Sequence, residues 1–191
     1  KINVAVVLLR HISNFTDFNR LEMDDRVHLF YSNNVDELQK ADIIIIPGSK
    51  STLDDLYELR QNGVAQAILR AHRNGVTVLG ICGGYQMMGK IISDPLCSEG
   101  GGEISGIGLL SGETVFAGEK TRTKTNGKFS ELEGFFSALS DADFNGYEIH
   151  MGQTVHNGKK LLSCGGEIAG NAAGCYIHGI FDNAQVSERL I

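Results

Sequence analysis

At residues 80–89 the sequence reads Gly80-Ile81-Cys82-Gly83-Gly84-Tyr85-Gln86-Met87-Met88-Gly89. An apolar run over residues 76–81 leads into Cys82, and a helix-like segment follows at once. Glycines on both sides of the cysteine allow a sharp strand-to-helix turn, as in the G-x-S-x-G elbow of hydrolases. Such a turn lifts the thiol above the sheet edge and places it at a helix N-terminus, where a thiolate is stabilised. The segment therefore predicts a nucleophilic Cys82.

Two other interpretations of this segment remain open at this point. A cysteine at a glycine-rich turn can simply be buried and packed as a small hydrophobe. A nucleotide-binding loop fits less well, because the spacing does not give G-x-G-x-x-G and no P-loop lysine follows.

Strand and helix signals alternate on both sides of this elbow through the first half of the chain. Apolar runs at residues 2–9, 27–31, 43–46 and 76–81 have the composition of buried parallel strands. Apolar residues recur at helical spacing over residues 53–59 and 64–71. This alternation predicts an α/β fold of three layers, in which helices cover both faces of a mainly parallel central sheet.

The second half of the chain reads differently. Short β-like stretches predict extra antiparallel strands at residues 108–110, 113–117, 121–125, 144–150, 167–169 and 174–177. The glycine-rich residues 98–103 between the two halves are predicted to form a mobile loop.

Size, charge and cysteine content limit the class of protein. A chain of 191 residues with 42% apolar residues fits one domain, residues 1–191, and a net charge of −6 argues against a nucleic-acid surface. No apolar run approaches the ~20 residues that span a bilayer, and no signal peptide is recognisable. Four cysteines without a C-x-x-C pair favour a reducing cytoplasm and no metal site. The missing initiator Met indicates a fragment of a longer protein.

A cysteine nucleophile needs a base and oxyanion donors. His178, followed by Gly179 at the end of a short strand, is the predicted base, and His150 on another β-like segment is its rival. The N–H of Gly83 is one predicted oxyanion donor. Gly48 is the other, because it follows an isoleucine strand and Pro47 at the same sheet edge.

Taken together, these residues resemble the class I (triad) glutamine amidotransferases, which have a flavodoxin-like fold. The C-x-G-x-Q elbow of that family is matched by Cys82, Gly84 and Gln86, its Pro-Gly loop by Pro47-Gly48 and its late histidine by His178. The resemblance implies L-glutamine as substrate, with Gln86 helping to bind it.

The third member of the triad is missing from its usual place in the sequence. Most members of the family carry a glutamate two positions after the histidine, and here that position is Ile180. Glu148, His150 and Asp182 are left as possible orienting or substrate-side residues.

This departure is typical of the cobyric and cobyrinic acid branch of the family. Further matching stretches lie at residues 12–18, 146–152 and 176–183, and the whole chain resembles the C-terminal domain of the cobyric acid synthases. The resemblance implies that ammonia passes to an absent N-terminal synthetase domain. There ATP and Mg²⁺ would drive amidation of a corrinoid acceptor, adenosylcobyrinic acid a,c-diamide, to cobyric acid. No cofactor is expected in this domain.

Two alternatives stand beside this assignment. The chain could be the glutaminase of a related enzyme, either cobyrinic acid a,c-diamide synthase or the enzyme that amidates a cell-wall lipid precursor. It could also be a non-catalytic binding or regulatory module on the same fold.

Overall fold

Strand β1 (Ile2–Val7) shows why this chain forms layers. Val4 and Val6 point into one apolar core and Ala5 and Val7 into a second, and all four are fully buried. Successive side chains of a strand face opposite sides, so a strand covered on both faces reads as one apolar run. The structure, a computed structural model, describes residues 1–191.

A six-stranded central sheet forms the middle layer, in the order β2-β1-β3-β4-β10-β9. All neighbouring strands run parallel except β9 against β10, which confirms the mainly parallel sheet. Besides β1, its strands are β2 (Val27–Ser32), β3 (Ile43–Ile46), β4 (Thr77–Ile81), β9 (Glu167–Ala169) and β10 (Ala172–Cys175).

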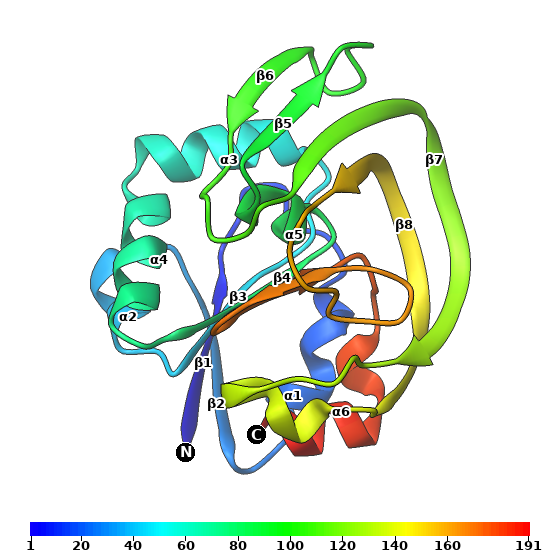
Figure 1. Cartoon of the computed structure of the whole chain (residues 1–191). Helices are drawn as coiled ribbons and strands as arrows, with labels where there is room; N and C mark the ends of the chain where they lie inside the picture. The colour runs from blue at the N-terminus through cyan, green and yellow to red at the C-terminus, as the bar shows by residue number, and fades with distance from the viewer.

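Helices cover both faces of this sheet, so the three-layer prediction is also confirmed (Figure 1). One face carries α2 (Val35–Gln39), α3 (Thr52–Gln61), α4 (Val64–Arg73) and α5 (Gly83–Met88). The opposite face carries α1 (Asn19–Glu22), α6 (Ala184–Leu190) and three short 3-10 helices, η1 (Phe15–Phe18), η2 (Gly134–Leu139) and η3 (Ile180–Asp182).

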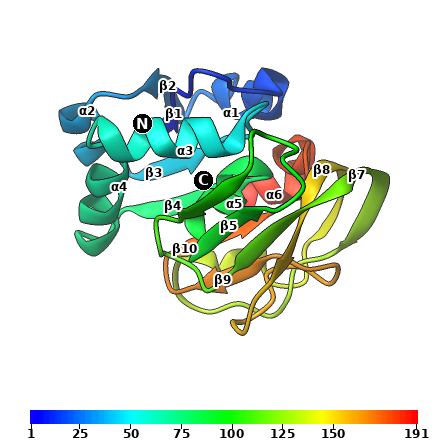
Figure 2. The ribbon, with the colours of Figure 1, turned by 90° about the horizontal axis from the view of Figure 1, so that it is seen from above.

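A second, mixed sheet in the order β6-β5-β7-β8 is built from the middle of the chain. Its strands are β5 (Ile91–Asp94), β6 (Gly102–Ser105), β7 (Glu113–Lys128) and β8 (Asp143–Val155). β7 and β8 form a long antiparallel ribbon that curves along one side of the molecule (Figures 1 and 2).

Three details of the predicted second half are wrong. Residues 113–117 and 121–125 belong to one strand, β7, because a bulge between Phe116 and Thr121 bends it without ending it. Residues 108–110 form no strand. Residues 174–175 end β10, which runs parallel to β4 inside the central sheet, and residues 176–177 lie beyond that strand.

The glycine-rich loop that the sequence predicts to be mobile has a definite hydrogen-bonded structure. The buried carboxylate of Asp94 accepts the N–H groups of Ser98, Glu99 and Gly101 at 2.8, 2.7 and 2.9 Å. Residues 102 and 103 then begin β6. One buried acid therefore orders a segment whose composition alone suggests disorder.

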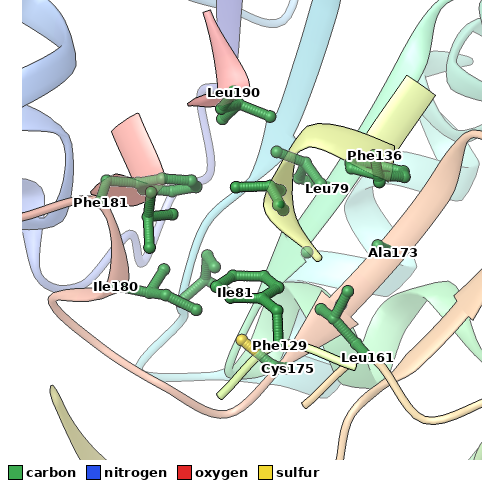
Figure 3. Close-up of a pocket in the computed structure, with 14 residues that line it drawn as sticks. Leu79, Ile81, Phe129, Phe136, Leu161, Ala173, Cys175, Ile180, Phe181 and Leu190 are labelled. Atoms are coloured by element: carbon green, nitrogen blue, oxygen red, sulfur yellow. The ribbon is translucent and has the colours of Figure 1, made fainter. Parts of the chain in front are cut away.

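A small cavity of about 30 Å³ lies between the central sheet and the helices of the α6 face (Figure 3). Leu79, Ile81, Phe136, Phe181 and Leu190 are among its lining side chains, which are apolar except for the Cys175 thiol. We assign this cavity to the core. No helix in the structure has the length and apolar content needed to cross a membrane.

Candidate active site

Cys82 lies at the turn between β4 and α5, as the elbow predicts. Its φ and ψ angles are 53° and −111°, a conformation that costs a non-glycine residue roughly 1–3 kcal/mol. Glycine is required at position 84, because a Cβ atom there would lie 1.9 Å from the carbonyl oxygen of Ile46. The elbow therefore holds α5 against the end of β3 and fixes where the thiol points.

The Cys82 thiol faces a pocket of about 300 Å³ at the carboxyl ends of the parallel strands. Its side chain donates to the carbonyl oxygen of Ile149 on β8 at 3.3 Å. The residue is 8% exposed, so the thiol is accessible only through the pocket. Gln86, His150 and His178 line the same pocket.

His178 is held between the end of β10 and strand β8. Its backbone N–H donates to the Tyr147 carbonyl at 2.8 Å, and its carbonyl accepts the Tyr147 N–H at 3.2 Å. The Tyr147 ring stacks on the imidazole with centroids 5.3 Å apart. His178 is 1% exposed, and 96 positions of sequence (178 − 82) separate it from Cys82.

The side chain that orients His178 is Asp17, which the sequence analysis did not identify. Asp17 Oδ2 accepts from His178 Nδ1 at 2.8 Å, and Asp17 Oδ1 accepts the backbone N–H of Gly179 at 2.9 Å. Asp17 is 3% exposed and comes from η1, the turn that follows β1. The available signal was position, since η1 lies after the carboxyl end of a parallel strand and carries the Ser-Asn-Phe-Thr-Asp run.

Asp17 and Cys82 change the acid–base behaviour of the imidazole. Burial works to lower the pKa of His178, but hydrogen bonds and charges from Asp17 and Cys82 outweigh burial and raise it from 6.5 to about 9. With Nδ1 bonded to Asp17, Nε2 is the nitrogen left to exchange a proton with the thiol. The arrangement therefore favours a protonated imidazole beside Cys82 at neutral pH.

Neither acid suggested from the sequence as an orienting group takes that place. Glu148 Oε2 lies 3.2 Å from Nε2 of His150, so it pairs with the other histidine. Asp182 makes no hydrogen bond to His178, and burial together with the charge of Asp17 raises the pKa of Asp182. The Nδ1 atom of His178 is instead hydrogen-bonded to Asp17, which comes from the turn after β1.

Two backbone N–H groups near the thiol have no acceptor within the protein, those of Gly48 and Gly83. Gly83 is the first residue of α5, where N–H groups have no partner in the helix. A Cβ at Gly48 would lie 3.3 Å from His178 Cε1 and 3.8 Å from Cys82 Cβ. The structure thus places both predicted oxyanion donors beside the nucleophile.

Gln86 and His150 form the inner wall of the pocket. The Gln86 amide is 3% exposed and donates to the Tyr176 hydroxyl at 3.1 Å. The His150 ring stacks on Tyr176 with centroids 3.7 Å apart, and its Nδ1 donates to the Gly152 carbonyl at 2.7 Å. His150 therefore lines the pocket but is not hydrogen-bonded to His178.

The sequence also did not predict the charged side chains that line the pocket. Lys50, Lys120 and Arg122 line it, and none of them is in an ion pair. Glu99 is the one acid in the lining, and its carboxylate accepts the N–H of Leu53 at 3.2 Å. The pocket can therefore hold a ligand that carries both a carboxylate and an ammonium group.

Comparison with known proteins points to one family. The CobB/CobQ-like glutamine amidotransferase domain model matches residues 3–186. The chain is 55% identical over 203 residues to cobyric acid synthase of Phocaeicola vulgatus and 53% identical over 202 residues to that of Bacteroides fragilis. Each match covers 100% of this chain and 39% of the relative, so the chain spans about two fifths of their length.

Solved structures show the same fold at low sequence identity. PurLQS from Thermotoga maritima superposes with a TM-score of 0.73 at 18% identity and covers 100% of this chain and 97% of that one. A glutamine amidotransferase from Thermotoga maritima gives a TM-score of 0.64 at 13% identity, covering 98% and 80% of the two chains.

Proposed function

The chain belongs to the CobB/CobQ-like glutamine amidotransferase domain family, and from this we propose that it hydrolyses L-glutamine through a thioester on Cys82. The observation that carries the proposal is that Cys82 and His178 line one pocket while the buried Asp17 is hydrogen-bonded to His178. A nucleophile, a base and a buried acid in this order are the elements of a catalytic triad.

In the proposed reaction the Cys82 thiolate attacks the side-chain amide carbon of glutamine. The N–H groups of Gly48 and Gly83 stabilise the oxyanion, each contributing about 3–4 kcal/mol to the transition state. His178 protonates the amide nitrogen as the carbon–nitrogen bond breaks, and ammonia leaves. His178 then takes a proton from water, which attacks the thioester to release glutamate and restore the thiolate.

The acceptor of the ammonia is proposed from the relatives. Both relatives described above are named cobyric acid synthase, and their length leaves room for a further domain. We infer that this N-terminal synthetase domain binds ATP and Mg²⁺ and amidates adenosylcobyrinic acid a,c-diamide in the cytoplasm. The chain described here would supply the ammonia.

A glutamine-analogue diazo ketone tests the proposed chemistry directly. We expect it to alkylate Cys82 more than about 100-fold faster than the other three cysteines, because the thiolate is the reactive form. Burial raises the pKa of Cys175 to about 12 and also raises the pKa of Cys164. Peptide mass spectrometry gives the rate at each site. Equal labelling of the exposed Cys97 or Cys164 would instead indicate a module without a glutamine site.

The charged mouth of the pocket is proposed to bind the backbone end of glutamine. Arg122 pairs across the ribbon with Ile149, whose carbonyl holds the Cys82 thiol, so its guanidinium reaches the same pocket. We assign the α-carboxylate to Arg122 and Lys120, and the α-ammonium to Glu99. A ligand without an α-carboxylate or without an α-ammonium group would leave one of these charged side chains unpaired, so the pocket should select against it.

Replacing Arg122 by alanine is expected to raise KM for glutamine about 10- to 100-fold, the loss of one charge-assisted hydrogen bond. The value of kcat should fall less, because the guanidinium does not contact the reacting amide. Steady-state glutaminase assays measure both. Lys124→Ala is the matched control, since Lys124 lies on the same strand but not in the pocket lining. An unchanged KM in Arg122→Ala would rule out this role.

A further inference from the structure

Asn14 contacts the catalytic imidazole in a way that the triad does not explain. Its side-chain nitrogen Nδ2 lies 3.0 Å from Nδ1 and 3.1 Å from Nε2 of His178. A point in the ring plane at these two distances would fall closer to Cε1 than van der Waals contact allows. The amide therefore lies over the face of the ring and not in line with either nitrogen.

The backbone conformation at Asn14 allows its side chain to make this contact. Its φ and ψ are both 54°, a left-handed conformation that asparagine tolerates better than most residues. The Asn14 carbonyl accepts the backbone N–H of Asp17 at 3.0 Å. One short turn thus supplies both the acid at the edge of the imidazole and the amide over its face.

The segment before Asn14 is hydrogen-bonded to the loop that holds Gly48, the predicted oxyanion donor. The N–H of Ser13 donates to the carbonyl of Gly48 at 3.0 Å, and Ile12 forms a β-bridge with Ser49. Any displacement of this segment therefore acts on the base and on the oxyanion donor together.

We propose that Asn14 is a positioning residue, which holds the plane of the His178 ring so that Nδ1 stays on Asp17 while Nε2 stays directed at the Cys82 thiol. A single hydrogen bond at Nδ1 leaves the imidazole free to tilt about that bond. Contacts over the ring, from Asn14 and from the stacked Tyr147, remove this freedom. The role rests on the proposed glutaminase function for its effect on turnover, but not for its effect on the thiol.

Replacement by glycine separates the side chain from the backbone, because glycine adopts the left-handed conformation without strain. In Asn14→Gly we expect kcat for glutamine to fall about 10- to 100-fold, with KM within about twofold, since small misplacement of a catalytic group has effects of this size. The rate of Cys82 alkylation by iodoacetamide at pH 7 should fall as well, because the imidazolium no longer stays beside the thiolate. Asp141→Gly is the control, as Asp141 is also left-handed with φ 59° but exposed and outside the pocket.

The Asn14→Asp variant tests whether Asn14 acts on the imidazole or only supports the fold, because only the first role predicts a change in the pH profile. The aspartate keeps the shape and should recover part of the lost kcat, and its charge joins Asp17, Cys82 and Tyr147 around the imidazole. We expect the alkaline limb of kcat for glutamine to move up by roughly one pH unit, because His178 must be protonated to release ammonia and a nearby carboxylate stabilises the imidazolium.

Two outcomes would overturn the proposal. One is an Asn14→Gly protein with native kcat and native alkylation rate, and the other is an Asn14→Asp protein whose alkaline limb does not move. If the native protein does not hydrolyse glutamine, the proposed function fails by itself. The position of His178 is still read in that case from Cys82 alkylation, which needs no substrate.

Discussion

Replacing Cys82 by serine is expected to lower glutamine hydrolysis by at least about 10⁴-fold, the effect of removing the nucleophile from a catalytic triad. Serine keeps the size and the elbow conformation, but its hydroxyl is far less acidic than a thiol and does not form an ion pair with His178. The variant should therefore fold and bind glutamine normally. Release of glutamate from glutamine by the full-length protein is the measurement.

Two controls distinguish loss of the nucleophile from a general effect of the substitution. Cys164→Ser removes an exposed cysteine outside the Cys82 pocket and should retain native turnover. The proposed amidation, supported by added ammonium salt, should survive in Cys82→Ser, because only the ammonia supply is lost. Turnover of glutamine by Cys82→Ser at the native rate would exclude the thioester mechanism.

Asp17→Asn is expected to lower kcat about 10³- to 10⁴-fold, although Asp17 lies 161 positions from the histidine it orients. The Asn amide can donate to Nδ1, which selects the imidazole tautomer that carries its proton towards Cys82. The hydrogen bond from the Gly179 N–H can still be accepted by the amide oxygen, so the fold should change little.

The pH dependence separates this role from a loss of stability. Asp17 is among the groups that raise the pKa of His178 to about 9, so without its charge the imidazolium loses its proton at lower pH. The alkaline limb of the residual glutaminase activity should therefore move down from about pH 9. The titratable groups left around the ring are Cys82 and Tyr147, and burial raises the pKa of Tyr147.

Asp182→Asn is the matched control for Asp17→Asn. Asp182 is a nearby acid whose charge interacts with Asp17, but it makes no hydrogen bond to the imidazole. It should leave kcat within about threefold of native, the size of a modest electrostatic change. A larger loss in Asp182→Asn than in Asp17→Asn would transfer the orienting role to Asp182.

A triad assembled in this way depends on three separate connections of the central sheet. Cys82 follows β4, His178 follows β10 and Asp17 follows β1, and Gly48 follows β3. Because parallel strands all end at the same edge, each connection needs only a short loop to reach the pocket. The long β7–β8 ribbon then closes the pocket from the side, with Ile149 against the thiol and Tyr147 against the imidazole.

The sequence alone was sufficient to predict those features that depend only on neighbouring residues. The elbow at Cys82 could be predicted because glycine is required at position 84, and the parallel sheet because its strands read as unbroken apolar runs. Gly48 could be placed because it follows such a strand, and His178 because it follows a short strand-like stretch, although that stretch was predicted to be antiparallel. Short-range steric contacts and burial determine these features, and both can be inferred from the order of small and apolar residues in the sequence.

The tertiary structure decided which distant side chains meet. Asp17 and Asp182 both follow the end of a parallel strand, so this positional signal does not decide which acid pairs with His178. The sequence also does not show that Asn14 lies over the imidazole or that Arg122 lines the pocket. These contacts depend on how far each loop reaches beyond the sheet and on the bend of the β7–β8 ribbon at its bulge. A hydrogen bond requires placement to within a fraction of an ångström, and that is set by the packing of the whole chain, not by any single segment.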